Sequence, residues 1–468
     1  MKKIFVCLMA VVATAGHFSC KNQLNELPTQ SKVEGNVIID QKSAEIALNG
    51  AYLTFAEGGD DRGTPSVKWA LNHEILTSIL GGNLRYPWGK VDFEENNRIT
   101  SNAPAVQNLW TKYYTLINAA NGVIEQTQAL SDTKIARLRK TEIIAEARLL
   151  RAYGHYNLLR LFAQFYDINS KYGAMLRTEF VHTDNIAQSR STVQESYSSI
   201  FSDIDFAIEN APSDKPNHYI NKWVAKSLKC KVLTLRGSAT DQKEILALSE
   251  DIIDNAPYKL EENTMELFSN KGISSTEVIF GVMPKPNQFT KTDAYYYRTS
   301  PGYLVTDYFK SLFDSNDPRA TKIIGSETLE ENAVIKYRGK VPEDCYAIRL
   351  TEIYLLRAEA ITRSGLKLDD AKTILKTVLK HAGVSNFEKI DRINTSKEMI
   401  LELYKETVRN FAFEDGQDWT TLCRLPLEEI LKIKPSVMDK NHIILPIPAE
   451  EFRKNPKVGE QNPGYNKI

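Results

Sequence analysis

Hydrophobic positions recur at three- and four-residue steps over most of the chain between Gln107 and Leu260. This spacing gathers apolar side chains on one face of an α-helix. The stretch from 138 to 162 carries two such stripes, formed by Leu138, Ala145, Leu149, Ala152, Tyr156 and Leu159 and by Ile144, Leu158 and Phe162. A helix with two apolar stripes packs on both sides, as in stacked helical hairpins. We therefore predict a mainly α fold.

The pattern changes between about Thr264 and Arg349. Glu277–Val282 is short and apolar, which predicts a strand, and prolines at 284, 286, 301 and 318 indicate long connections. Helical spacing then returns at 346–363, 369–381 and 396–413. The remaining tail predicts an extended segment at 443–448 and a type II turn at Pro463-Gly464.

One seven-residue pattern occurs twice. Glu146-Ala-Arg-Leu-Leu-Arg-Ala and Glu352-Ile-Tyr-Leu-Leu-Arg-Ala share Glu-x-x-Leu-Leu-Arg-Ala, and the small Ala152 and Ala358 allow neighbouring helices to approach closely. Helix pairs of this length resemble tetratricopeptide-type repeats, although no regular 34-residue period runs through the chain. Chance similarity between two amphipathic helices is the alternative explanation.

Composition adds exclusions rather than a function. Lys and Arg number 59 and Asp and Glu number 59, so the formal net charge of the 468-residue chain is zero. A balanced chain generates no summed field that would attract nucleic acid or an anionic membrane. Its 42% of hydrophobic residues is sufficient for a well-filled globular protein.

The first twenty residues predict export. Lys2 and Lys3 precede an apolar run from Ile4 to Ala15, which spans about 18 Å as a helix and is too short to cross a bilayer. This pattern is typical of a signal peptide, which we assign to residues 1–19. Cys20 then resembles the lipid-attachment site of a bacterial lipoprotein; the alternative is an ordinary cleaved signal followed by an incidental cysteine.

The other cysteines do not predict disulfides. Three remain after Cys7 and Cys20, namely Cys230, Cys345 and Cys423, and an odd number is a poor disulfide framework. No C-x-x-C pair is present for zinc or thiol redox chemistry. We expect small buried thiols.

Catalytic and cofactor motifs are missing from the sequence. His73-Glu-Ile-Leu-Thr lacks the second histidine of a zinc protease, and no G-x-S-x-G or G-x-G-x-x-G occurs. The adjacent acids Asp60-Asp61 and Glu94-Glu95 could serve a glycosidase, but adjacent acids are far more often a solvated loop. We expect no catalytic residues, no cofactor and no metal.

Aromatic residues in two loops are the remaining functional signal. Consecutive rings in a loop cannot all face one core, and flat rings with polar neighbours suit stacking on sugars. The alternative is that these rings attach long loops to the helical body. The candidate ligand-binding residues are the rings of Tyr86, Trp88, Tyr295, Tyr296, Tyr297 and Tyr303, with Asn83, Arg85, Asp61 and Arg298 as polar partners.

Together these features resemble the SusD/RagB family of Bacteroidetes outer-membrane lipoproteins. The resemblance covers the whole chain, and the order and spacing of its motifs make it specific. The motifs after the lipoprotein-like start are Leu24-Asn-Glu-Leu-Pro, Trp110-x-x-Tyr, Ile117-Asn-Ala-Ala-Asn, the two segments that begin at Ala145 and Arg349, Phe411-Ala-Phe-Glu-Asp-Gly-Gln-Asp-Trp, Leu445-Pro-Ile-Pro and Gln461-Asn-Pro-Gly-Tyr.

The resemblance implies a fold and a partner. It implies tetratricopeptide-like helical hairpins that support a loop-rich, minor-β ligand-binding part, with an N-terminal region at 20–260 and a C-terminal region at 261–468. Members usually are not enzymes. They capture glycans, less often peptides, and deliver them to a SusC-like TonB-dependent transporter in the outer membrane, where the lipid at Cys20 would anchor this chain, at the cell surface or in the periplasmic leaflet.

Two other classes stay open at this point. A secreted or lipid-anchored glycoside hydrolase could carry its two acids anywhere in the chain, and a purely structural repeat protein would bind only other proteins.

Overall fold

The computed structural model describes residues 37–61, 64–67, 70–89, 91–283, 291–297, 300–325, 331–339, 341 and 345–467. The predicted signal peptide and Cys20 lie outside these residues. The long helices are α2 (Gln41–Ala56), α4 (Pro104–Ala129), α5 (Arg137–Phe162), α6 (Val193–Asn210), α7 (Lys222–Arg236), α8 (Ala239–Asn255), α12 (Leu350–Arg363), α13 (Leu368–His381) and α15 (Ser396–Phe411). The predicted mainly α fold is confirmed.

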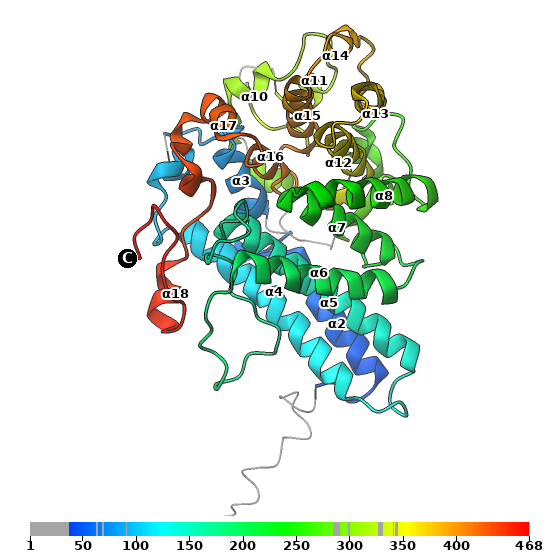
Figure 1. Cartoon of the computed structure of the whole chain (residues 1–468), viewed down its shortest axis with the longest axis vertical. Coiled ribbons are helices and arrows are strands. Elements are labelled where there is room, and N and C mark those ends of the chain that lie inside the picture. The colour runs from blue at the N-terminus through cyan, green and yellow to red at the C-terminus, as the bar shows by residue number, and fades with distance from the viewer. Residues whose placement is uncertain are drawn as a thin grey trace, which may run out of the picture.

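These helices form a continuous stack. Each of α4 to α8 packs on the next, α8 packs on α12, and α12 packs on both α13 and α15. In Figure 1 the stack rises from α4 and α5 below to α12, α13 and α15 above. Helix α2 contacts α4 and α5 from the other side. The fully buried Ala152 and Ala358 lie within this stack, as expected for close helix approach.

Local sequence sets the ends of these helices. Capping boxes begin α6, α8 and α15, where Thr192, Ser238 and Thr395 each accept from a backbone N–H in the first turn. Helix α7 ends at Gly237, whose φ of 68° lies in the left-handed region that favours glycine. Such signals are readable in the sequence.

Short elements fill the space beside the stack. The π-helical turn η1 (Ala70–Ile75) and α3 (Leu76–Leu80) follow α2, and the C-terminal part wraps back over them. The other short helices are η2 (Asp92–Glu94), η3 (Asn96–Arg98), η4 (Leu267–Lys271), η5 (Gly272–Ser274), α9 (Lys291–Tyr295), α10 (Asp307–Ser311), α11 (Ala320–Ile323), α14 (Glu388–Asp391), α16 (Gln417–Leu422), α17 (Leu427–Ile433), η6 (Pro435–Val437), η7 (Lys440–Ile443) and α18 (Ala449–Lys454).

The strands of the described chain form antiparallel pairs. They are β1 (Glu57–Asp61) with β2 (Thr64–Val67), β3 (Leu84–Arg85) with β7 (Leu304–Val305), β4 (Val278–Gly281) with β8 (Tyr346–Arg349), and β5 (Tyr296–Tyr297) with β6 (Ser300–Pro301). The strand predicted at 277–282 is β4.

The prediction that a helix begins at 346 is wrong. Residues 346–349 are strand β8, because their backbone pairs with β4 and side chains on both faces are buried. A short apolar run that is buried on both sides cannot be distinguished from a helix by periodicity. Leu138 was also expected in an apolar stripe, but it is 74% exposed in the first turn of α5. The C-terminal turn is confirmed, since Gly464 has a φ of 87° and Tyr465 N donates to Asn462 O.

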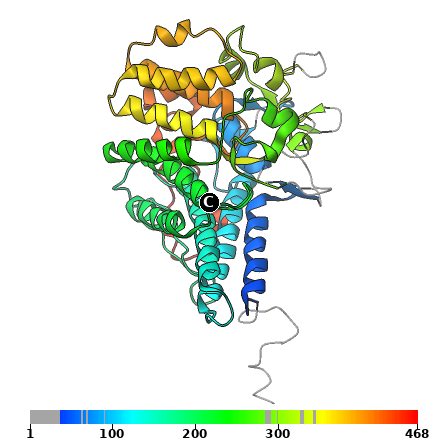
Figure 2. The same cartoon turned by 90° about the vertical axis from the view of Figure 1, so that its right-hand side faces the viewer.

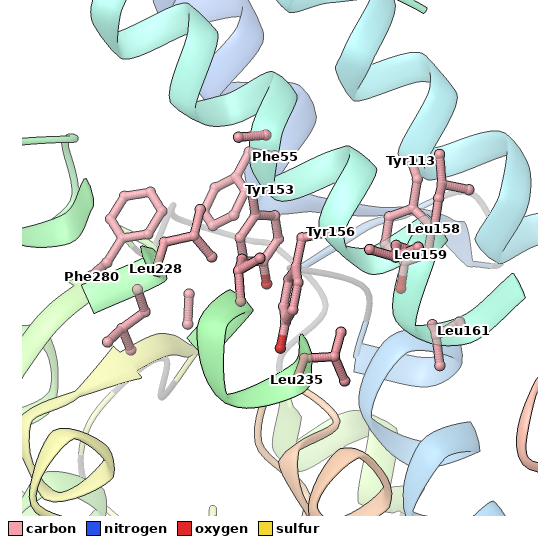
Figure 3. Close-up of a cluster of buried hydrophobic side chains, with 14 of the residues drawn as sticks. Phe55, Tyr113, Tyr153, Tyr156, Leu158, Leu159, Leu161, Leu228, Leu235 and Phe280 are labelled. Carbon is pink, nitrogen blue, oxygen red and sulfur yellow. The ribbon is translucent and has the colours of Figure 1, made fainter. Parts of the chain in front are cut away.

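The hydrophobic core crosses the boundary expected at residues 260 and 261. Figure 3 shows Phe55 of α2, Tyr153 of α5 and Phe280 of β4 side by side. The rings of Phe55 and Phe280 are stacked with centroids 4.8 Å apart, and Tyr153 meets Phe55 edge-on at 5.2 Å. Residues from both predicted regions therefore share one core. The three described cysteines are buried, as expected.

A buried run of charges also joins the two regions. The segment Phe411–Trp419 lies in the interior, where Glu414 is 1% exposed. Its carboxylate accepts from Lys336 Nζ at 2.5 Å and from Arg349 Nε at 2.8 Å. Arg349 also donates to Glu277 at 2.8 Å. Each buried cation thus has a buried carboxylate partner, which is what makes such groups tolerable in a core.

The neighbouring Asp415 connects the C-terminal segment to the helices of the N-terminal region. One of its oxygens lies 2.9 Å from Nε2 of His73 and also accepts from the Tyr153 hydroxyl. The other oxygen accepts from Lys231 Nζ at 3.1 Å, and Lys231 pairs with Glu352 at 2.8 Å. Asp415 therefore links η1, α5, α7 and α12 through charged contacts that water does not screen.

Replacing Glu414 should be strongly destabilising. Glu414→Gln removes the negative charge shared by Lys336 and Arg349 and leaves two buried cations short of a partner. We expect the free energy of unfolding to fall by about 3–5 kcal/mol in urea titrations. Glu428→Gln is the control, since the Glu428 side chain is 64% exposed and its pair with Lys397 is screened by water. Equal unfolding midpoints for the two variants would contradict this role for Glu414.

Candidate ligand-binding platform

The structure brings the two predicted aromatic loops together. Strands β3 and β7 pair Leu84 with Val305 and Arg85 with Leu304. The pairing continues into hydrogen bonds, because Thr306 N donates to Asn83 O at 3.1 Å. Residues 83–85 and 304–306, more than 200 residues apart in sequence, are therefore held side by side.

Four rings from these loops form a series that runs from solvent into the core. Trp88 meets Tyr86 with centroids 5.3 Å apart, Tyr86 meets Tyr303 at 6.1 Å, and Tyr303 meets Tyr295 at 6.4 Å. All three contacts are edge-to-face, which is a preferred aromatic geometry. Trp88 is 65% exposed, Tyr86 and Tyr303 are half-buried, and Tyr295 is 1% exposed. We call Tyr86, Trp88 and Tyr303 the platform.

Backbone contacts hold the outer rings in place. Tyr86 N donates to Glu94 Oε1 at 2.8 Å, which fixes the chain just before Trp88. Lys434 Nζ in turn donates to Glu94 O at 2.7 Å and to Ile79 O at 3.4 Å. The loop that carries Trp88 is thus attached to α3 and to the C-terminal part of the chain.

The inner loop is held by a buried ion pair. Lys291, in the first turn of α9, lies 2.9 Å from Glu74 of η1, and both side chains are buried. The other oxygen of Glu74 accepts from Asp415 N at 3.0 Å. Tyr295, one turn after Lys291, stacks on Tyr337 at 5.3 Å. Sequence reasoning missed Lys291, Glu74 and Tyr337, because a buried lysine cannot be distinguished from an exposed one by its sequence pattern.

Asn83 and Tyr295, two of the predicted ligand-binding residues, are buried. Asn83 is fully buried and donates through Nδ2 to Asp418 at 3.0 Å, so its amide supports the loop from below. Tyr295 is buried against Tyr337 and Phe413, and its ring braces the platform. These contacts attach the loop of Tyr295 to the body of the protein, as the alternative explanation expects of such a ring.

Of the remaining predicted ligand-binding residues, some have a described side chain and others do not. Arg85 is exposed on β3, and after the hydrogen bond and charge of Lys310 it is a smaller contribution to the lowered pKa of the Asp307 carboxyl. Asp61 lies on β1 and Tyr296 and Tyr297 on β5, where side chains are outside the described part of the chain. Arg298 lies outside the described residues altogether.

The acids considered for glycosidase chemistry have structural partners where the structure describes them. Glu94 binds the backbone of Tyr86, and Glu95 pairs with Arg98 at 2.8 Å. Within the described residues, no group of three or more His, Cys, Asp or Glu is arranged to hold a metal ion. The described part of the platform contains no assembled acid–base pair.

Comparisons with known proteins agree with this geometry. Residues 71–233 match a family model described as "Starch-binding associating with outer membrane", and residues 331–429 match the model of the SusD family. The chain belongs to the SusD/RagB family. Members of this family are binding proteins of the cell envelope that associate with the outer membrane.

Individual SusD/RagB relatives are distant in sequence. A SusD-like protein of Bacteroides ovatus is 23% identical over 208 residues, which cover 43% of this chain and 36% of the relative. The match thus spans about a third of that curated relative. In the part of the chain that the structure describes, no helix is both long and apolar enough to cross a membrane.

Solved structures share the fold. A SusD superfamily protein from Bacteroides thetaiotaomicron has a TM-score of 0.76 at 20% identity, covering 91% of this chain and all of that one. A SusD-like carbohydrate binding protein from Bacteroides vulgatus has a TM-score of 0.68 at 18% identity, covering 83% and 84%. At these identities the likeness concerns the fold.

The stability of this SusD/RagB protein should depend on pH through Asp418. Burial raises the pKa of the Asp418 carboxyl from 3.8 to about 6. The hydrogen bonds from Asn83 and Trp419 N lower the pKa, but their effect is smaller than that of burial. The folded state then holds this proton more tightly than the unfolded state. Its contribution to stability is complete below about pH 4 and is lost as the pH rises through about 6.

Urea unfolding between pH 3.5 and 7 measures this contribution. The difference in unfolding free energy between wild type and Asp418→Asn should shrink by on the order of 1–3 kcal/mol across the window. Parallel pH profiles for the two proteins would show that Asp418 does not titrate there.

Proposed function

We propose that this protein captures oligosaccharides on the platform and delivers them to a TonB-dependent transporter in the outer membrane, to which a lipid on Cys20 keeps it close. The observation that carries the proposal is the series of rings that ends in the exposed Trp88. The described residues leave 65% of Trp88 exposed beside its edge-on contact with Tyr86. Aromatic faces beside polar groups suit the apolar faces of sugar rings.

The way the platform is built supports this use. Its outer rings are supported by Tyr295 and Tyr337 beneath, so a ligand would meet rings that are already fixed and would lose little conformational freedom on binding. The exposed Arg85, on the strand that precedes Tyr86, can donate to hydroxyl oxygens.

Delivery to a transporter removes the need for tight binding. Two binding partners that are held together raise the effective concentration of the ligand, and the second partner adds its own contacts. A peptide ligand is the alternative within the same family, and a peptide panel in the titration below distinguishes the two.

Trp88→Ala should weaken ligand binding without unfolding the protein. An exposed stacking ring contributes about 1–2 kcal/mol, so affinity should fall about tenfold while Tm stays unchanged. Calorimetric titration with maltoheptaose first, then with a wider panel of oligosaccharides, measures the affinity. Leu366→Ala is the matched control, since Leu366 is 52% exposed and lies in the turn between α12 and α13. Tyr295→Ala should instead lower Tm, because the Tyr295 ring is buried against Tyr337. A fall in Tm for Trp88→Ala at unchanged affinity would overturn the platform.

Cys20→Ala tests the lipid anchor. Several acyl chains hold a lipoprotein stably in a membrane, whereas a chain without lipid is released. Fractionation of cells that express the variant should find it in the soluble fraction or as an unprocessed precursor. Cys423→Ala is the control, since that thiol is buried in the fold. If Cys20→Ala stays in the membrane fraction like wild type, the anchor assignment is wrong.

A further inference from the structure

Helix α2 exposes a second apolar face. One side packs on α4 and α5 through Ala44, Leu48, Ala51, Tyr52 and Phe55. On the other side Ile46 is 61% exposed and Leu53 is 37% exposed, and Ile39, just before the helix, is 51% exposed. Within the helix, Ile46 and Leu53 are seven positions apart and so lie along one line. Figure 2 shows α2 on the outer edge of the molecule, with the other helices of the stack to one side.

This line leads into an apolar groove of about 400 Å³. The groove lies between the end of α2, the segment with His218 and Tyr219, and the residues after β4, including Met283, which is 46% exposed. Among the described residues that line it there is no Asp, Glu, Lys or Arg, and burial lowers the pKa of His218, which keeps that ring neutral. The groove therefore presents an uncharged surface.

The groove walls are fixed before any partner arrives. Tyr52 donates its hydroxyl to Glu146 at 2.7 Å and accepts from Ile220 N at 2.8 Å, and its ring meets Tyr219 edge-on at 5.1 Å. Phe55 stacks on Phe280 at 4.8 Å. A rigid apolar surface of this kind loses little freedom when it is covered.

Gly50 is the residue on this face that the fold itself does not explain. It lies inside α2, between Ile46 and Leu53. Glycine inside a helix makes that helix less stable than alanine would. A Cβ added at Gly50 would have no described atom within 4 Å, whereas one at Gly154 of α5 would lie 2.6 Å from Ile117. Packing within the described chain thus accounts for Gly154 but not for Gly50. A glycine on an open face permits the close approach of another backbone.

Two facts indicate which partner would cover this face. Only 17 positions separate Cys20 from Val37, the first described residue, a span of at most about 60 Å. A lipid on Cys20 would therefore keep α2 near the membrane. The face lacks the basic residues by which helices bind anionic lipid, since Lys42 is the single cation of α2. A protein embedded in that membrane fits both facts.

We propose that the α2 face of Ile46, Gly50 and Leu53, with the adjoining groove, is the surface on which the outer-membrane transporter docks. This rests on the proposed function, which supplies the transporter and the lipid anchor. The surface is separate from the platform, so the two can be changed independently.

Three variants of the full-length lipoprotein test the surface. Gly50→Arg places a bulky charge in the centre of the face, and Leu366→Arg places the same charge at an exposed leucine elsewhere. Gly50→Ala controls for folding; its Tm should be equal to that of wild type or about 1 °C higher, because no described atom opposes the added methyl group. The readout is recovery of a TonB-dependent barrel in mild-detergent pull-downs, identified by mass spectrometry, beside the Tm of each variant.

We expect wild type and Leu366→Arg to recover the transporter equally and Gly50→Arg to recover at least tenfold less at an unchanged Tm. If wild type, Leu366→Arg and Gly50→Arg recover the transporter equally, the docking surface is wrong and the proposed function still holds. If wild type recovers no transporter, both the docking surface and the proposed function are wrong. A soluble-chain dimer that Gly50→Arg dissociates, or binding of that chain to phosphatidylglycerol vesicles that the same variant abolishes, would assign the face to another occupant and overturn the proposal.

Discussion

The interaction on which the structure depends is the buried charge network around the segment 411–419. Glu414 and Asp415 lie where the helical stack meets the C-terminal part of the chain, and each neutralises cations from elements far apart in sequence. Removing one partner of a buried ion pair leaves an uncompensated charge in the core and lowers the free energy of unfolding by several kcal/mol. The elements that supply these partners therefore stabilise one another. This condition makes the two halves of the chain interdependent, as their shared core also indicates.

The same network positions the platform. Asp415 N donates to Glu74, Glu74 pairs with Lys291, and Lys291 begins the short helix that ends at Tyr295. Asp418, three residues after Asp415, holds Asn83 directly before the strand that leads to Tyr86 and Trp88. Both loops are thus attached to one buried segment. A rigid support of this kind allows exposed rings to keep their positions without packing of their own.

The two surfaces differ in the kind of contact that they offer. The platform combines rings with polar neighbours, as binding a small polar ligand requires. The α2 face carries exposed apolar side chains and a glycine, and the described residues of its groove include no Asp, Glu, Lys or Arg, which suits a second protein surface. They belong to different elements, one to the loops beside β3 and β7 and the other to the first helix of the stack.

The sequence predicted the helical stack, because amphipathic spacing, capping residues and Gly237 are local signals that tertiary contacts here reinforce. It also determined the family, through short motifs whose order runs along the chain. Strand β8 could not be predicted, because its strand geometry comes from pairing with β4 and not from its own pattern. The sequence likewise indicated that rings gather in two loops, but not which ones face solvent. Tertiary structure decided that, since Tyr295 became a buried support and Trp88 stayed exposed according to which neighbours the fold placed around each ring.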